Sequence, residues 1–541
     1  MDKKIKVLFV IPPYFDVNDY LNESSSTALP AFTIPYGILS IDAFIKANTN
    51  VELETALIDL NVEALKIIKG GQYYHASYFA DLVSKEVQKK DPSIVAISAL
   101  FNTSYNYIES IVAAVKKQSM SILTVIGGGL PTNLYGRILE EIPQIDGACY
   151  GEGEIPMADL VNATDYEKLF NEHQSWGNGK SIRSGKILTN SFVHDLDEIP
   201  GFDFRLINLD DYNSRSLDKR YSGQNNKREM SIHTSRGCPY KCVFCANGKL
   251  HGKEVRFMSV EKVMNDVKKM IDQFDLNVLM IEDDNFLYDK IRAKKILRKL
   301  SKLGLRIEFP NGLAVYAIDE EIGKLLKNAG ASTIPLAVES GSNYVLRNVI
   351  NKPLKTAMIN DRVKILRKNG IQVHAFIVVG LPGELDEHRL ETMNMLKDVG
   401  FDWVHVFIAI PVVGSRLYDI CVDNNYLVQN DWKNHTISKA NIKAPGIDPE
   451  KIEEFAYFLN LAINFVNNYN MAQGEYEKAA VYFTNVTIRY PEHAFAHYFL
   501  SKAYEHMNFD AELVENHISI YTRLVEKNEN WKKYKSIFNL V

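Results

Sequence analysis

Short apolar runs alternate with amphipathic segments over the first 160 residues. The runs KVLFVI, IVAISAL and ILTVIGGG are apolar almost throughout, which is typical of parallel strands covered on both faces. The segments ILSIDAFIKA and YIESIVAAVKK place apolar residues at helical spacing, and so predict the covering helices. Residues 1–160 are therefore expected to form a doubly wound, Rossmann-like α/β domain with a parallel sheet.

The rest of the chain divides into three further parts. Polar, Asn- and Ser-rich sequence over 161–230 predicts a connector with little core of its own. Between 231 and 425, six strand-like runs from SIHTS to WVHVFIAI alternate with five helical segments. This pattern predicts a (β/α) barrel or part of one, whose reactive groups gather at the carboxyl ends of the strands. Residues 426–541 have helical periodicity and predict an all-α tail.

One stretch of the tail is similar to a known repeat. GEYEKAAVYFTNVTIRYPEHAFAHYFLSKAYEH places small and aromatic residues as a helix–turn–helix of about 34 residues would, and it resembles one tetratricopeptide repeat. Because a single repeat is usually accessory helical packing, a docked helical cap is favoured over a peptide-binding array. A protein partner bound through the tail stays open.

Composition and charge narrow the class of protein. The 541 residues include 62 Lys and Arg against 67 Asp and Glu, for a formal net charge of -5, so no electrostatic attraction to nucleic acid or an anionic membrane is expected. A hydrophobic fraction of 46% excludes a disordered chain. No apolar stretch is long enough to span a bilayer, and MDKKIKVLFV runs into a strand pattern rather than a signal peptide. A soluble, cytoplasmic protein is expected.

Five cysteines are too few for a disulfide framework, yet three of them are clustered. Cys238, Cys242 and Cys245 stand in SRGCPYKCVFCAN, a C-x3-C-x2-C spacing after the first barrel strand. Three thiolates from one short loop can hold three irons of a four-iron cluster and leave the fourth iron open to chemistry. A zinc site with His251 is the structural alternative, but zinc ligands usually come as two short-spaced pairs and the sequence has no second pair. Three unrelated buried thiols are disfavoured, because the intervening Pro-Tyr-Lys offers no periodic apolar face.

With Phe244 in the aromatic slot, the cysteine motif resembles that of the radical S-adenosylmethionine (radical SAM) enzymes. In that family the open iron of a 4Fe-4S cluster chelates S-adenosylmethionine. One electron then cleaves the cosubstrate to methionine and a 5′-deoxyadenosyl radical. The resemblance implies that the cysteines are both cluster ligands and catalytic residues, and that a flavodoxin- or ferredoxin-type protein donates the electron.

The resemblance also implies S-adenosylmethionine contacts at segments that follow successive barrel strands. The residues concerned are Phe244, Asp283, Asp284, Glu339, Ser340, Gly380, Pro382 and Gly383. The paired Asp carboxylates suit the methionine ammonium, although Asp284 or Asn285 could instead be a helix N-cap. The glycines of VVGLPGE allow a tight turn that brings backbone close to the adenine, and Glu384 could be merely an acid in the first turn of a helix.

The N-terminal motifs resemble the cobalamin-binding domain of one large radical SAM subclass. Its segments after strands are matched by SALFNTS, VIGGGLPT and YGEGE, which implies cobalamin contacts at Ser98, Leu100, Asn102, Thr103, Gly127, Gly128, Gly151, Glu152, Gly153 and Glu154. Glycines at strand ends allow a large flat ligand to approach the backbone in the crevice beyond a parallel sheet.

Two departures bear on cobalamin. Other cobalamin-binding domains supply a His below the cobalt, whereas no His precedes His75 here, and Leu130 stands where many relatives carry His. Either cobalamin binds without a protein nitrogen below the cobalt, or the domain is vestigial; binding is favoured because the glycine loops persist. A plain doubly wound domain for a nucleotide or for packing alone stays open, since no G-x-G-x-x-G fingerprint decides it.

The combined resemblance covers residues 1–425 and implies a cobalamin-dependent radical SAM methyltransferase. Methylcobalamin, formed from one S-adenosylmethionine, would supply the methyl group, and the adenosyl radical from a second would activate a carbon or phosphorus of a small-molecule or peptide substrate. A cyclase or rearrangement enzyme that uses cobalamin for redox chemistry is the alternative within this class. A non-catalytic cobalamin- or redox-responsive scaffold is the alternative outside it.

Overall fold

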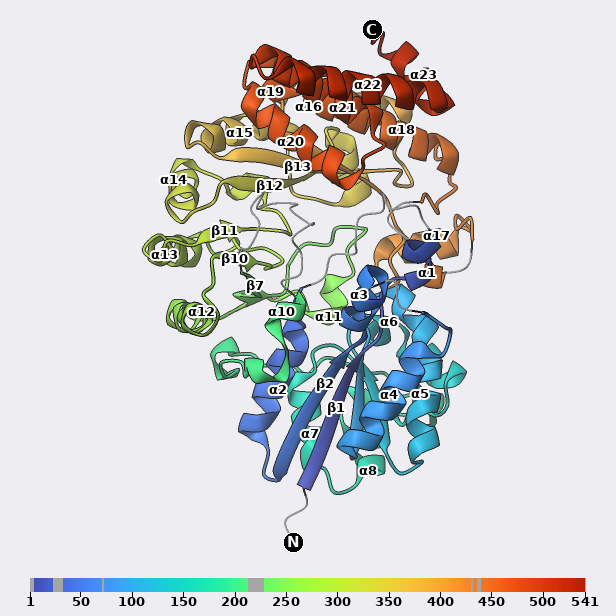
Figure 1. Ribbon diagram of the computed structural model, residues 1–541. Coiled ribbons are helices and arrows are strands. Elements are labelled where there is room, and N and C mark those ends of the chain that lie inside the picture. Colours follow the sequence, from blue (N-terminus) through green and yellow to red (C-terminus); the bar gives the residue numbers. More distant parts are fainter. Residues whose placement is uncertain are drawn as a thin grey trace.

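The N-terminal domain is built on a six-stranded sheet, at the bottom of Figure 1. The computed structural model describes residues 4–22, 33–70, 73–212, 228–429, 432–434 and 439–540. The strand order is β2-β1-β3-β4-β5-β6, with only β6 antiparallel to its neighbour. These strands are β1 Lys4–Ile11, β2 Glu52–Asp59, β3 Ile94–Ser98, β4 Leu123–Gly127, β5 Gly147–Cys149 and β6 Trp176–Gly177.

Helices cover both faces of this sheet, so the predicted doubly wound domain is confirmed. Alternate residues of β1 enter different cores: Val7 and Phe9 belong to one cluster, and Leu8 and Val10 to another. The helices are α1 Val17–Asn22, α2 Tyr36–Asn48, α3 Leu60–Gly70, α4 Tyr78–Lys90, the short η1 Asn102–Ser104, α5 Tyr105–Gln118, α6 Gly129–Glu141, α7 Glu154–Asn162, α8 Tyr166–Glu172 and α9 Gly179–Arg183.

The predicted connector is not a bare linker, and the expectation that it has little core is wrong for residues 161–212. Trp176 in β6 is buried and its indole N–H donates to the Pro156 carbonyl at 2.7 Å. Leu196 and Phe204 are also buried in the larger core. Single large apolar anchors among polar residues leave no periodicity, which is why the pattern concealed them. The short helices here are η2 Leu196–Glu198, η3 Phe204–Leu206 and α10 Leu209–Tyr212.

Six parallel strands form the barrel, as predicted. They lie in two three-stranded sheets, β11-β10-β7 and β12-β13-β14, which a parallel bridge between Leu313 and Leu336 joins. The strands therefore follow one another in chain order, as in a partial (β/α)6 barrel. They are β7 Glu229–Ile232, β10 Val278–Ile281, β11 Arg306–Glu308, β12 Thr333–Glu339, β13 Gln372–Val379 and β14 Trp403–Ile408.

Five helices alternate with these strands along the chain. They are α12 Val260–Phe274, α13 Lys290–Leu300, α14 Glu320–Asn328, α15 Ile359–Lys368 and α16 Asp386–Val399. α12 shows how the sequence sets such a helix: the Ser259 hydroxyl caps its start, Val263 and Val267 are buried, and Asp275 ends it at φ 51°. Shorter elements are β8 Ser235–Arg236, β9 Arg256–Phe257, α11 Asn247–Leu250, η4 Val315–Ala317, the π-helix η5 Val345–Ile350, η6 Thr356–Met358 and α17 Arg416–Asp423.

The C-terminal tail is helical and docks on the edge of the barrel (top of Figure 1). The Asn464 side chain accepts from the Val404 N–H and donates to the Val404 carbonyl, both at 2.8 Å, and so covers edge strand β14. Tyr482 stacks on Trp403 with ring centroids 5.3 Å apart. The elements are η7 Trp432–Asn434, α18 Pro449–Leu461, η8 Ala462–Val466, α19 Tyr469–Ala472, α20 Tyr476–Arg489, α21 Ala494–His506, α22 Ala511–Lys527 and α23 Glu529–Ile537.

α20 and α21 form the expected helix–turn–helix, while the likeness to a tetratricopeptide repeat stays a prediction. Within the described ranges, no helix combines the length and apolar character needed to cross a membrane.

Candidate functional site

The three clustered cysteines lie on a loop that a two-stranded ribbon closes. β8 and β9 pair antiparallel, with Arg236 opposite Arg256 at the two ends of the loop 237–255. Gly237 is required next to the first cysteine, because it has φ 92° and an added Cβ would lie 2.2 Å from the Glu254 carbonyl oxygen. The ribbon and the glycine hold the loop's two ends together.

The middle of the loop is anchored to the barrel. The Val243 N–H donates to the carbonyl of Ile350 at 2.9 Å, and the Val243 carbonyl accepts from the Leu417 N–H at 2.8 Å. Phe244 is partly buried against the large core. The cysteines therefore stand on a backbone held from two directions, after the first strand of the barrel.

All five cysteines of the chain are free thiols. Cys238 and Cys242 are half-buried and Cys245 is exposed. Burial raises the pKa of Cys242 to about 11, Lys352 opposes the rise, and the neighbouring thiols of Cys245 and Cys238 add to it. Three free thiols that influence one another, with a cation beside them, fit the donor set of an iron–sulfur cluster.

No three His, Cys, Asp or Glu side chains in the described parts of the chain are gathered into a metal-binding group. The assignment of the thiols therefore rests on their chemistry and their shared loop. His251, the fourth ligand of the zinc alternative, directs Nδ1 to the Glu152 carboxylate at 2.8 Å. That contact gives the zinc alternative no support.

Asp284 and Glu339 reach the cysteine loop from two different strands. Asp284 accepts from the Asn247 amide within the loop at 2.5 Å, and its charge adds to the burial that raises the pKa of Cys238. Glu339 ends β12 at φ 68° and accepts from Lys352 Nζ at 3.0 Å, and its charge also adds to the rise in the pKa of Cys242. These predicted contact residues and the thiols thus share one region at the carboxyl ends of the strands.

Asp283 does not join this group. Its carboxylate accepts from the Thr234 N–H at 2.5 Å and from the hydroxyls of Thr234 and Ser235, each at 2.6 Å. The side chain is buried and ties the end of β10 to the segment after β7. The structure corrects the prediction: Asp283 supports the site from behind and offers no free acceptor toward it.

The alternative interpretation of Asp284 or Asn285 as a helix N-cap is also wrong. α13 begins only at Lys290, and the Asp289 side chain caps it by accepting from the Arg292 N–H at 3.0 Å. Asn285 instead donates to the Tyr316 hydroxyl at 3.1 Å. Tyr316 in turn packs edge-on against Tyr240 of the cysteine loop, with ring centroids 5.9 Å apart.

Ser340 is fully buried and lies within hydrogen-bond distance of the Thr392 hydroxyl, at 3.2 Å. Its oxygen also accepts from the Ser342 N–H at 3.1 Å. The predicted contact with cosubstrate is therefore replaced by a bond that holds the turn after β12 to α16.

The turn after β13 has the expected left-handed glycines, Gly380 at φ 86° and Gly383 at φ 96°, on either side of Pro382. Glu384 is not in the first turn of a helix, since α16 begins at Asp386. It is buried and accepts from the Gly380 N–H at 2.7 Å, so it closes the glycine turn. The reading of Glu384 as a helix acid is wrong.

At the N-terminal sheet, most predicted cobalamin residues lie at the carboxyl edge. Ser98 and Gly127 are register partners at the ends of β3 and β4. Gly128 follows at φ 106°, and a Cβ there would lie 2.6 Å from the Ala99 carbonyl oxygen. Leu100 is 55% exposed at this edge. The loop after β3 also contains Asn102 and Thr103, and the Thr103 hydroxyl donates to the Tyr14 carbonyl at 2.5 Å.

The loop after β5 is crowded by protein. Gly151 has φ 79° and would place a Cβ 1.7 Å from Asn190 Oδ1, while a Cβ on Gly153 would meet Ile41 at 2.6 Å. Glu152 and Glu154 are buried and form ion pairs with arginines of the barrel segment. The structure therefore corrects their predicted role: these two carboxylates join domains rather than face a ligand.

Sequence reasoning missed Lys352, the cation beside the thiols, and it missed Arg236 and Arg256 at the two ends of the cysteine loop. Lys352 stands in NKPL, where no periodicity marks it, and only its distance from Glu339 reveals it. Arg236 lies two residues before Cys238, so its place in the motif was a usable signal.

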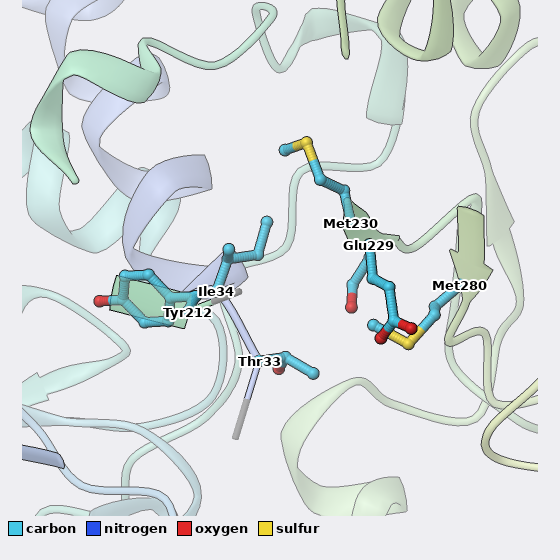
Figure 2. A pocket seen from close by; sticks show the side chains of 7 residues that line it. Thr33, Ile34, Tyr212, Glu229, Met230 and Met280 are labelled. Carbon is cyan, nitrogen blue, oxygen red and sulfur yellow. The ribbon is translucent and has the colours of Figure 1, made fainter. Parts of the chain in front are cut away.

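Two concavities lie away from this site. Figure 2 shows Thr33, Ile34 and Tyr212 facing Glu229 and Met280 across a cavity of about 20 Å³ at the start of β7. A larger one of about 720 Å³ is lined by Phe202 to Arg205, Ile207 to Asp210, Arg228, Gln273 and Phe274. Neither is lined by a residue predicted to hold a cofactor, and the first is too small for anything beyond a water molecule.

Comparison with known families assigns the two domains. The Radical SAM superfamily matches residues 232–396 and the B12 binding domain matches residues 27–161. Residues 232–396 therefore form a radical SAM domain, and members of that superfamily hold a 4Fe-4S cluster and S-adenosylmethionine. The B12-binding domain at residues 27–161 adds cobalamin to these cofactors.

Relatives agree with this assignment. Cytidylyl-2-hydroxyethylphosphonate methyltransferase of Streptomyces wedmorensis is 25% identical over 469 residues, covering 81% of this chain and 87% of the relative. Anaerobic magnesium-protoporphyrin IX monomethyl ester cyclase of Rubrivivax gelatinosus is 27% identical over 344 residues, covering 62% of this chain and 60% of the relative. The fold resembles that of the cobalamin-dependent S-adenosylmethionine radical enzyme OxsB, with a TM-score of 0.63, 13% identity and coverage of 100% and 82% of the two chains.

Proposed function

We propose that the protein transfers a methyl group from S-adenosylmethionine, by way of cobalamin, to an unactivated carbon or phosphorus of a small-molecule or peptide substrate. The observation that carries the proposal is the direct contact between the base of the cysteine loop and the β5 loop of the B12-binding domain. When bound, the cluster supplies the electron that cleaves S-adenosylmethionine and cobalamin carries the methyl group.

Cys238, Cys242 and Cys245 hold the cluster in this proposal. Asp284 and Glu339 act electrostatically on these thiols and are the acceptors offered to the methionine ammonium of S-adenosylmethionine. Lys352 neutralises part of the negative charge that thiolates and carboxylates bring together. The remaining predicted residues shape this region: Phe244, Asp283, Ser340, Gly380, Pro382 and Gly383.

The cobalamin side of the proposal rests on the carboxyl edge of the N-terminal sheet. Backbone at Gly127 and Gly128 can approach a flat ligand closely, and the exposed Leu100 can pack on it. Leu130 is buried in the core, so that position offers no ligand to cobalt. Cobalamin is therefore proposed to bind without a nitrogen ligand from position 130.

Methyl transfer is tested with reconstituted protein, hydroxocobalamin and methyl-labelled S-adenosylmethionine under anaerobic reduction. Labelled product beside 5′-deoxyadenosine is the expected result. Product without label would favour a cyclase or rearrangement enzyme. The methyltransferase relative matches the larger share of this chain, 81% against 62%, which favours methyl transfer.

A scaffold without catalysis predicts that the cluster forms but S-adenosylmethionine stays intact. The Cys238→Ala, Cys242→Ala and Cys245→Ala triple variant is the control, and equal cleavage by both proteins would overturn the proposal.

The electron is proposed to come from a flavodoxin- or ferredoxin-type donor, and a protein partner on the helical tail remains a proposal. The cytoplasm is the proposed location, because its thiol pools keep cluster cysteines reduced. Reduction of the cluster by purified flavodoxin, followed spectroscopically, tests the first point.

A further inference from the structure

One carboxylate of the N-terminal domain lies between the two arginines at the base of the cysteine loop. Glu152 Oε2 accepts from Arg236 Nη1 and from Arg256 Nη1, each at 3.0 Å. Glu152 Oε1 accepts from Arg256 Nη2 at 2.5 Å and lies 2.8 Å from His251 Nδ1. The exposed fractions of Glu152, Arg236 and Arg256 are only 5%, 6% and 5%, so solvent does not screen these contacts.

The two arginines stand at the two ends of the cysteine loop. Arg236 and Arg256 face each other across the β8–β9 ribbon, and the loop between them contains all three cluster cysteines. A carboxylate bound to both guanidinium groups holds the two ends of the loop at a fixed separation. His251 makes a third contact from within the loop.

The charges at this junction balance. Glu154 Oε1 accepts from Arg236 Nη2 at 2.8 Å, so two carboxylates face two guanidinium groups. Arg256 also donates to the Val193 carbonyl at 2.7 Å. Desolvation works against ionised Glu152, but the charge of Arg236 and the bonds from His251 and Arg256 hold its pKa well below the ordinary range. Removing this one charge would leave the buried Arg256 guanidinium without a carboxylate partner, while Arg236 would keep Glu154.

We propose that Glu152 is a positioning residue that clamps the base of the cluster loop and ties it to the end of β5 in the B12-binding domain. The inference rests on the proposed function only in assuming that the loop holds a 4Fe-4S cluster. The carboxylate acts through Arg236 and Arg256 and touches no reacting atom. Its role is to set how the cluster loop faces the neighbouring domain.

Hydrogen exchange of the protein without cofactors tests the clamp. In Glu152→Gln, amides of the loop 237–255 are expected to exchange at least about ten times faster, while those of β4 keep their rate. Glu167→Gln, an exposed carboxylate on α8 that pairs with Lys180, is the control and leaves the loop unchanged. Loop exchange equal to that of the native protein would overturn the clamp.

Two further variants separate positioning from folding. Arg256→Lys keeps the charge but replaces a forked donor by a single ammonium, and Glu152→Asp keeps the carboxylate. Both are expected to accelerate loop exchange less than Glu152→Gln does. The reduced cluster of Glu152→Gln should also give a broadened electron paramagnetic resonance signal that S-adenosylmethionine sharpens less than in the native protein. An unchanged signal would contradict the proposal.

Failure of the proposed function gives a different result. If the native protein holds a cluster but does not cleave S-adenosylmethionine, the proposed function is wrong, whereas the exchange of the loop in protein without cofactors still decides the clamp.

Discussion

The carboxyl edge of the barrel sheet and that of the N-terminal sheet rely on different kinds of chemical group. The barrel edge gathers side chains with their own chemistry: three thiols, Asp284, Glu339 and Lys352. The N-terminal edge, by contrast, relies largely on backbone and small residues such as Gly127 and Gly128. The difference follows from the cofactors, because a cluster needs covalent ligands whereas a large flat cofactor needs room beside the backbone.

The largest effect is expected at the barrel edge. The Cys238→Ala, Cys242→Ala and Cys245→Ala triple variant should lose its bound iron and form no 5′-deoxyadenosine, because no other thiol stands on that loop. Iron content and product chromatography measure both. The triple variant should still bind hydroxocobalamin, and its failure to do so would show that the two edges do not function separately.

Gly128→Ala tests the N-terminal edge. The added Cβ would lie 2.6 Å from the Ala99 carbonyl oxygen at φ 106°, so the free energy of unfolding should fall by about 2 kcal/mol. Hydroxocobalamin affinity should fall as well, whereas iron content should not. Gly185→Ala has φ 92° with open space around it and is the matched control. Equal losses in both variants would mean that crowding at this edge has no role.

Lys352→Met sharpens the electrostatic side of the comparison. Without this cation, Glu339 and the thiols face one another uncompensated, so the cluster should be harder to reduce and S-adenosylmethionine cleavage should slow by about ten-fold. Spectroelectrochemical titration measures the reduction potential of the cluster. Lys352→Arg should keep this potential close to that of the native protein, and the exposed Lys355→Met should leave it unchanged. A native potential in Lys352→Met would contradict this account.

The smallest effect is expected from a buried carboxyl in the barrel sheet. Burial raises the pKa of Glu308 to about 7, above the usual carboxyl value. The folded protein therefore holds a proton that the unfolded chain releases, and the free energy of unfolding should fall by about 1 kcal/mol between about pH 6 and about pH 7. Glu308→Gln should flatten this fall in denaturant titrations. The exposed Glu320→Gln is the control, and an unchanged slope in Glu308→Gln would count against the assignment.

Much of this architecture could be predicted from the sequence because its signals are local. Apolar runs predicted all six barrel strands, and the C-x3-C-x2-C spacing placed three thiols on one loop. Interpretation failed where a residue's partner lies far along the chain. Asp283 and Asp284 are adjacent and chemically identical, yet one is bound to Thr234 and Ser235 while the other reaches Asn247 in the cysteine loop.

The same limit applies between domains. YGEGE was interpreted as a ligand loop because it resembles a segment of the cobalamin-binding domain and has glycines at a strand end, but Glu152 and Glu154 are bound to Arg236, 84 and 82 residues away. Trp176, Leu196 and Phe204 likewise gave no periodic signal, although they bury the connector in the core. Which of these side chains meet depends on how segments far apart in the sequence pack against one another.

By itself, then, the sequence determined the strand and helix order, the three-thiol loop and the glycine-rich sheet edge, since each depends on neighbours within about one element. Only the tertiary structure decided which carboxylates face the cysteine loop, that Lys352 lies beside it and that Glu152 joins the two domains. The physical reason is that buried charge must find its partner in space, and distance along the chain says nothing of where that partner lies.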